Sequence, residues 1–133
     1  MKTLLDTQIL VWWLQGDDRL PARCRRVIAK AGPEAPLLVS EISLWEIATL
    51  CDLGRLRVSL PLRDWLETAA APPLVRRCGI SPAIAAEVAA LPKSFHRDPA
   101  DRILVATARV LGATLLTVDE KIIDAKIVPT LGE

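Results

Sequence analysis

The stretch TLLTVD at residues 114–119 carries the clearest β-strand pattern of the chain, because apolar and β-branched residues run up to a terminal acid, Asp119. The chain opens in the same way, with TLLD at residues 3–6 ending in Asp6. Helical segments follow each strand, and this alternation predicts an α/β fold with a mostly parallel central sheet. Three more strands are predicted at short apolar runs, residues 37–39, 74–80 and 126–128.

The helices are predicted from their end signals. Helix-ending glycines occur at Gly16, Gly54 and Gly112, and Asp98 stands as a capping acid before Pro99, which takes the first helical position. The expected helices cover residues 8–14, 21–30, 40 or 43 to 53, 62–71, 82–91 and 100–111, with a short one after residue 119.

The composition fits one compact domain over residues 1–133. Apolar residues make up 51% of the chain, which is enough for a substantial core. The longest apolar stretch, residues 9–14, is too short to cross a bilayer, and the first residues lack the features of a signal peptide. We therefore expect a soluble cytoplasmic protein with no membrane association.

Charge and cysteine usage narrow the classes of function. The net charge is +1, so attraction of the whole molecule to nucleic acid is weak and depends on local basic groups. The three cysteines form no CxxC pair and are expected to be unpaired, neutral thiols. The single histidine, His96, cannot make a zinc site alone, and either a plain loop residue or a phosphate contact remains open for it.

Two adjacent tryptophans, Trp12 and Trp13, cannot both point into one core from a helix. One of them is expected at the surface, where it would mark an interface with a second copy or a partner. Partial burial under a loop is the alternative.

Four acids that are far apart in the sequence fall where a parallel sheet would gather them. Asp6 and Asp119 each follow a strand directly, Glu46 lies in an apolar helix and Asp101 opens a late helix. In parallel sheets, sites form beyond the carboxyl ends of the strands. Several carboxylates in one crevice repel each other unless a cation lies among them. Since no His or Cys cluster accompanies them, they indicate a hard divalent metal ion and phosphate chemistry.

Each acid also has a structural explanation, which the sequence leaves open. Asp6 can serve as a helix cap, and Asp98 and Asp101 can be the cap and the first-turn acid of one helix. Glu46 can belong to an exposed polar stripe with Ser43 and Thr49, because these residues are spaced at helical intervals.

Four segments occur in the order and spacing of a known family and extend over residues 3–128. They are LLDTQILVWWL, VSEISLWEIATL, HRDPADRILVATA and TLLTVDEKI. With these segments the chain resembles the PIN-domain nucleases, specifically the VapC-like ribonuclease toxins of type II toxin–antitoxin systems. The resemblance implies a three-layer α/β/α sandwich with a mostly parallel central sheet.

The resemblance also implies the chemistry of the site, which is endonucleolytic RNA cleavage dependent on Mg²⁺ or Mn²⁺. It implies an RNA substrate, a cognate antitoxin protein that covers the cleft, and a homodimer. The implied catalytic residues and metal ligands are Asp6, Glu46, Asp101 and Asp119, of which the last is the least constant in the family. Supporting contacts are expected from Thr7, Thr117 and Asp98, and RNA phosphate contacts from Lys93, Arg97 and Arg102.

Two other interpretations remain. A catalytically inactive PIN-fold protein-binding subunit would share the fold, and the presence of all four acids argues against it without demonstrating turnover. A receiver-like phosphate module also collects acids at strand ends, but the pair Asp6-Thr7 lacks the Asp-x-Asp pattern of the aspartyl-phosphate phosphatases.

Overall fold

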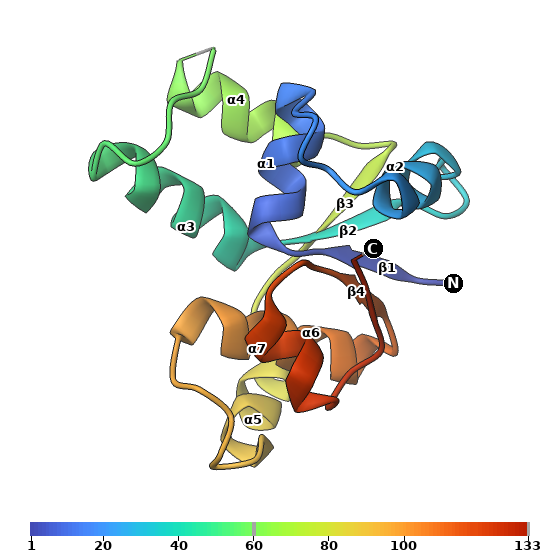
Figure 1. Cartoon of the computed structure of the whole chain (residues 1–133), viewed down its shortest axis with the longest axis vertical. Helices are drawn as coiled ribbons and strands as arrows, with labels where there is room; N and C mark the ends of the chain where they lie inside the picture. Colours follow the sequence, from blue (N-terminus) through green and yellow to red (C-terminus); the bar gives the residue numbers. More distant parts are fainter. Residues whose placement is uncertain (60, 133) are drawn as a thin grey trace.

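A computed structural model describes residues 1–59 and 61–132 of the chain. In this part of the chain, parallel strands form a central sheet with helices on both of its faces (Figure 1). The strands are β1 (Thr3–Leu5), β2 (Leu37–Ser40), β3 (Val75–Cys78), β4 (Thr114–Leu116) and β5 (Thr130–Leu131). The helices are α1 (Thr7–Gln15), α2 (Ala22–Ala29), α3 (Glu41–Asp52), α4 (Leu62–Ala69), α5 (Pro82–Ala90), α6 (Pro99–Leu111) and α7 (Glu120–Ala125).

The strand order is β3-β2-β1-β4-β5, and every pairing is parallel. After β1 the chain adds β2 and β3 on one side and then crosses over to add β4 and β5 on the other side. The strand order therefore reverses between β1 and β4. In the register of this pair, Leu5 lies opposite Leu116. Asp6 and Thr117 follow directly, and Asp6 N donates to Leu116 O at 3.0 Å. The crevice expected at such a reversal therefore opens beside Asp6.

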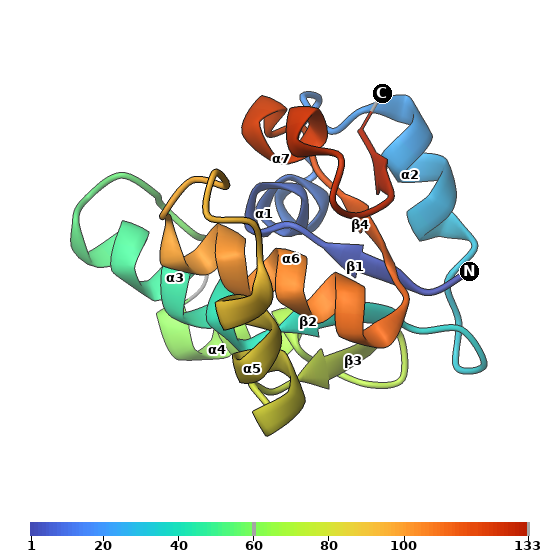
Figure 2. The same ribbon diagram turned by 90° about the horizontal axis from the view of Figure 1, so that it is seen from below.

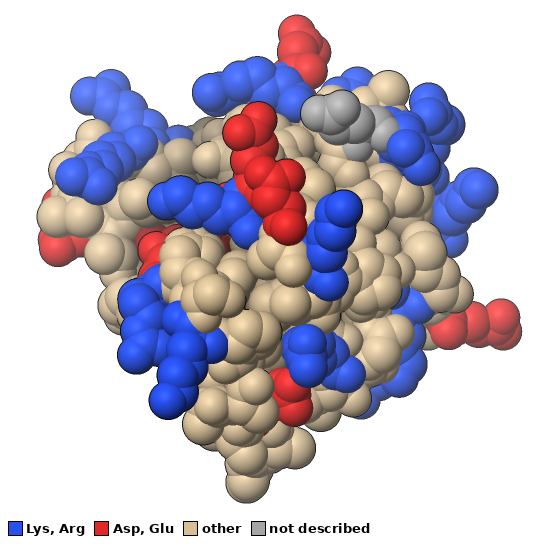
Figure 3. Space-filling view, turned by 60° about the horizontal axis from the view of Figure 1, so that its bottom comes forward, with Lys and Arg blue, Asp and Glu red and all other residues tan. Residues whose placement is uncertain are grey.

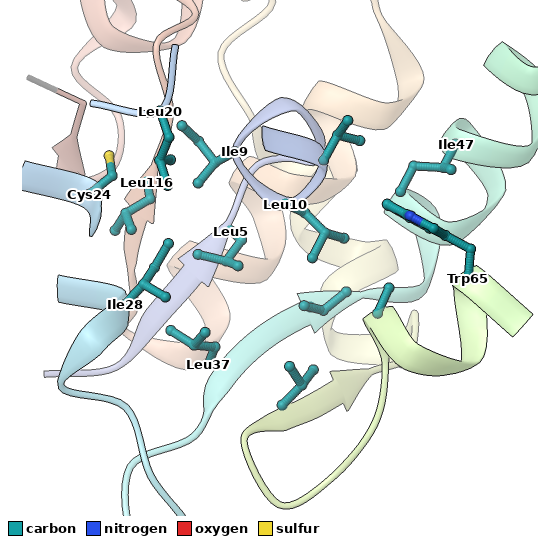
Figure 4. Packing of buried hydrophobic residues seen from close by; sticks show 14 residues of the cluster. Leu5, Ile9, Leu10, Leu20, Cys24, Ile28, Leu37, Ile47, Trp65 and Leu116 are labelled. Atoms are coloured by element: carbon teal, nitrogen blue, oxygen red, sulfur yellow. The ribbon is translucent and has the colours of Figure 1, made fainter. Parts of the chain in front are cut away.

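The strands are buried on both faces, because alternate side chains enter different cores. Leu5 and Leu116 belong to a cluster under α1, α2, α3 and α4, which also contains Trp65 (Figure 4). Leu4 and Leu115 belong to the cluster on the opposite face, under α5, α6 and α7. Figure 2 shows α5 and α6 in front of the strands from that side. The three-layer α/β/α sandwich with a parallel central sheet is confirmed.

The helix ends follow the local signals of the sequence. Gly16 and Gly112 end α1 and α6 in the left-handed conformation, with φ of 62° and 64°, where glycine is favoured. Of the two serines proposed to cap α3, Ser40 is the cap, and its hydroxyl accepts from Ile42 N at 3.1 Å. No helix in the described ranges combines the length and apolar character that crossing a bilayer requires.

The last strand lies further along the chain than predicted. Residues 126–128 are not a strand, because Lys126 ends α7 in the left-handed conformation with φ of 53° and turns the chain back. Ile127 then packs against the α5–α7 core, and its carbonyl accepts from Arg109 Nη1 at 3.0 Å. Pairing with β4 starts when Leu115 N donates to Pro129 O at 2.9 Å, so the edge strand is β5.

The cysteines behave as expected. Cys24 is buried, Cys51 and Cys78 are half-buried, and all three are unpaired. Burial raises the thiol pKa of Cys24 and of Cys78, which keeps these thiols neutral.

Candidate active site

A pocket of about 540 Å³ opens at the carboxyl ends of β1 and β4. Acidic atoms lie recessed between basic side chains on the face of the molecule drawn in Figure 3. All four acids singled out in the sequence line this one pocket, and a fifth acid lines it with them. These acids are Asp6, Glu46, Asp98, Asp101 and Asp119.

Asp6 is both a helix cap and a wall of the pocket. Its Oδ1 accepts from Thr7 N at 2.7 Å, and its Oδ2 accepts from the Thr117 hydroxyl at 2.6 Å. Thr117 Oγ1 in turn accepts from Asp119 N at 3.0 Å, which ties the two strand ends together. Burial raises the pKa of Asp6 to about 6, against the effect of these hydrogen bonds and with help from the charges of Glu46 and Asp119.

Glu46 lies on the side of α3 that faces α1. Ser43, one turn earlier, is fully buried and accepts a hydrogen bond from Thr7 Oγ1 at 2.9 Å. A polar stripe exposed to solvent would need Ser43 at the surface, so the exposed-stripe alternative is wrong. The exposed residue of this helix turn is Trp45, at 59%. The pKa of Glu46 is raised by burial and by Asp98, and the nearby Thr7 hydroxyl partly offsets this.

The start of α6 brings two carboxylates to the pocket. Asp98 is the cap, because its Oδ1 accepts from Asp101 N at 3.1 Å. The Asp101 side chain is therefore not used in capping α6, and it is only 14% exposed. Burial is the largest cause that raises its pKa to about 8, and the charges of Asp6, Asp98, Asp119 and Glu46 follow.

Asp119 follows the β4 segment and caps α7. Its Oδ1 accepts from Lys121 N at 2.8 Å. The structural and the functional explanation of these acids are therefore compatible, because the helices that follow parallel strands begin at the crevice.

His96 lies beside Asp101, which the sequence did not indicate. Its Nε2 is 3.2 Å from Asp101 Oδ2, and its ring meets the ring of Phe95 edge to face at 4.7 Å between centroids. The Nε2 atom is buried. Despite the short distance it forms no hydrogen bond with Asp101 or with any other described residue. In the sequence, only the position of His96 two residues before the capping Asp98 hints that it lies near the pocket, and that hint is weak.

The basic residues differ from expectation. Lys93 and Arg97 are exposed in the loop before α6 and do not line the pocket. Arg102 is buried, and its guanidinium donates to the carbonyls of Phe95, His96 and Val88 at 3.2 Å each. The expected contact between Arg102 and RNA is therefore wrong, because the side chain is buried and its guanidinium is directed at these carbonyls.

The pocket has basic residues that the sequence analysis did not assign to it, Arg19 and Arg55. Trp12 also lines it. Trp12 and Trp13 are both half-buried and pack against the α1–α4 core, so partial burial is the correct alternative for this pair.

The donor chemistry of the pocket fits a hard cation. Its ionisable oxygen donors are carboxylates, and no cysteine or histidine lines it. The side chains stand around the walls, and no three His, Cys, Asp or Glu groups of the described residues converge closely enough to hold one ion together. Burial and, after it, the neighbouring carboxylates raise the pKa of Asp101, and a bound cation would favour its charged form.

Comparison with known proteins agrees with this fold. The pattern of the PIN domain family matches residues 3–128. Ribonuclease VapC22 of Mycobacterium tuberculosis is 38% identical over 119 residues, which cover 90% of this chain and 88% of that protein. The chain therefore belongs to the PIN domain family and is a VapC-type ribonuclease toxin. Metal dependence is a general property of this family.

Solved structures share the fold at lower identity. DNA-bound VapBC from Salmonella typhimurium matches with a TM-score of 0.73 and 14% identity over 99% of this chain and 98% of that one. VapBC-1 from nontypeable Haemophilus influenzae matches with a TM-score of 0.72 and 16% identity over the same shares. Mycobacterium tuberculosis VapC20, a sarcin-ricin loop cleaving toxin, matches with a TM-score of 0.62 and 18% identity over 96% and 97%.

Proposed function

We propose that residues 1–133 form a single nuclease domain that cleaves RNA internally with a bound Mg²⁺ or Mn²⁺ ion. Asp6, Glu46 and Asp101 would hold the ion, and Asp119 would bind it or position water. The observation that carries this proposal is the convergence of carboxylates from four separate parts of the chain in one pocket. These carboxylates outnumber the arginines of the pocket, Arg19 and Arg55, and Arg19 is already paired with Asp17, so the site suits a divalent cation.

The residues would have distinct tasks. An ion bound here would favour the hydroxide form of a bound water and offset charge on the phosphodiester. Asp6 keeps a fixed orientation, because the Thr7 amide and the Thr117 hydroxyl each hold one of its oxygens. Glu46 and Asp101 reach the pocket from the helices α3 and α6, which leaves the space between them for the phosphate.

The proposal includes partners. The relatives in complexes with antitoxins suggest an antitoxin that covers the pocket of this chain too, and a homodimer is consistent with the exposed Trp45. The exposed Lys93 and Arg97 remain proposed contacts to flanking RNA phosphates. The reaction would take place in the cytoplasm.

Cleavage of a single-stranded RNA by the purified chain tests the proposal. Cutting is expected with Mg²⁺ or Mn²⁺ and none with a chelator. Asp101→Asn should abolish it, while Asp64→Asn, at an exposed position of α4 outside the pocket, should cut like the wild type. A folded wild-type protein that binds the ion and leaves RNA intact would support the inactive, protein-binding alternative.

A further inference from the structure

The acidic pocket continues along α1 into a region that holds no acid of the cluster. One face of α1 lines it, because Gln8, Val11, Trp12 and Gln15 are spaced at three and four residues. Trp12 lies six residues after Asp6, which is about 9 Å along the helix axis at 1.5 Å per residue. This end of the pocket is therefore close to the acids but differs from them in chemistry.

The guanidinium of Arg19 lies over the Trp12 ring there, and we name this pair, whose outer side is the exposed Arg19, the Trp12–Arg19 ledge. The guanidinium carbon of Arg19 lies 5.4 Å from the centre of the Trp12 ring. Asp17 fixes this guanidinium, since its Oδ2 accepts from Arg19 Nη2 at 2.7 Å and its Oδ1 accepts from Nε at 3.1 Å. The ion pair offsets the charge of Arg19, while 72% of its side chain stays exposed. The ledge therefore offers a planar face more than a free positive charge.

The opposite wall is the loop after α3, and it is attached to the same helix. Gln15 Nε2 donates to Arg57 O at 2.7 Å, and Leu56 packs against the α1–α4 core. Arg55, from this loop, lines the pocket and makes no ion pair with any residue in the described ranges. It is therefore free to bind an anion, unlike Arg19.

We infer that this end of the pocket is a subsite for one unstacked RNA base, with the base lying on the Trp12–Arg19 ledge and Arg55 contacting a neighbouring phosphate. Aromatic rings and guanidinium planes are the groups on which proteins stack the bases of single-stranded RNA. An unpaired arginine suits a phosphate. The inference rests on the proposed RNA substrate and adds the residues that hold one of its bases, which must be unpaired to reach the ledge.

Binding measurements with the non-cutting Asp101→Asn protein in Mg²⁺ test the subsite. The probes are a short single-stranded RNA, the same RNA in a duplex, and an oligoribonucleotide backbone without bases. The single strand is expected to bind about tenfold more tightly than the other two, in line with the strength of base stacking on aromatic side chains. Equal affinity for the strand with and without bases would overturn the inference.

Two further substitutions in that protein separate stacking from charge. Arg19→Gln should weaken binding of the single strand several-fold and hardly change binding of the base-free backbone. Arg55→Gln should weaken both alike. Arg23→Gln, at an exposed position of α2 outside the pocket, is the matched control and should change neither. Trp12→Phe, which keeps a ring, should retain more affinity than Trp12→Leu.

The outcomes distinguish this inference from the proposed function. A wild-type protein that cuts RNA, with Arg19→Gln and Trp12→Leu binding RNA normally, would overturn the subsite alone and leave the ledge to a side chain of a protein partner. A wild-type protein that cuts no RNA would overturn the proposed function, while preference for the base-containing strand would still support the subsite.

Discussion

Asp101 is the residue whose ionisation depends most on its neighbours. Burial and the charges of Asp6, Asp98, Asp119 and Glu46 raise its pKa from 3.8 to about 8, and Asp6 follows with a pKa of about 6. In the metal-free protein Asp101 therefore holds its proton at neutral pH, and Asp6 holds its proton below about pH 6. A metal ion has to displace them, so its affinity should rise with pH over this range.

The same shifts predict how the stability of the metal-free protein depends on pH. A carboxyl whose pKa is raised on folding contributes stability that is complete below its unfolded pKa, 3.8, and is lost as the pH rises through the folded value of about 8. The melting temperature measured with a chelator is expected to fall between pH 5 and pH 8.5. In Asp101→Asn the part of the fall above about pH 6.5 should disappear, and an unchanged slope would contradict the raised pKa of Asp101.

His96 gives a prediction on metal affinity. Its Nε2 lies 3.2 Å from Asp101 Oδ2 without a hydrogen bond, and a small rotation of the ring would let it donate to that carboxylate and fix its orientation. Groups that orient metal ligands typically change affinity by about 10- to 100-fold. His96→Leu is expected to weaken Mn²⁺ binding, measured by calorimetry, within that range, and His96→Gln, which keeps a donor, should recover part of it. Lys93→Gln, from the same loop, is the control, and equal losses in the Gln and Leu proteins would argue for packing alone.

At the scale of the elements, helix caps and site residues coincide. Asp6 keeps both functions in one side chain, since Oδ1 caps α1 while the carboxylate lines the pocket. Asp98 and Asp119 combine the two in the same way. The geometry follows from the connection, because a helix that starts at the carboxyl end of a parallel strand begins at the crevice.

Two substitutions separate these functions at α1. Asp6→Asn is expected to retain the cap and lose RNA cleavage, because Asn also caps helices but carries no charge. Asp6→Ala should lose both and reduce the free energy of unfolding in urea by about 1 kcal/mol. Asparagine and alanine proteins of equal stability would show that the cap contributes little.

The sequence predicted the elements where local chemistry decides them. Gly16, Gly112 and Asp98 set helix ends through bonds to nearby residues, and the sequence predicts all three. For α3 the sequence narrows the cap to Ser40 or Ser43, and the structure shows Ser40. The position of β5 was missed because it depends on where the returning chain meets the edge of β4, which no local pattern records. Local sequence signals therefore predict the ends of the helices better than the position of the edge strand.

At the scale of the whole molecule, strand order decides which acids meet. The placement of β4 beside β1 brings Asp119 next to Asp6, and the general rule for parallel sheets was enough to predict this meeting. The rule does not predict which basic residues line the pocket. Arg102 is buried and bonded to backbone carbonyls, whereas Arg19 and Arg55 line the pocket. Their positions depend on the paths of the loops around the pocket, which the rule does not describe.

Metal binding should stabilise the whole fold. A ligand that binds the folded state alone stabilises it by mass action, about 2.7 kcal/mol at 100 times its Kd. Millimolar Mn²⁺ is expected to raise the melting temperature of the wild type at pH 8, relative to a chelator at equal ionic strength. The shift should shrink strongly in Asp101→Asn and remain in Asp64→Asn. No shift in the wild type would count against a metal site among these acids.

The burial of Arg102 limits which substitutions this position can accept during evolution. Its planar guanidinium reaches the carbonyls of Val88, Phe95 and His96 at once, and so holds the segment before α6 against α5. A lysine ammonium keeps the positive charge but cannot span the same three acceptors in one plane. Arginine-to-lysine exchange, usually among the easiest changes on a protein surface, should therefore be selected against at this position, although the side chain does not line the acidic pocket.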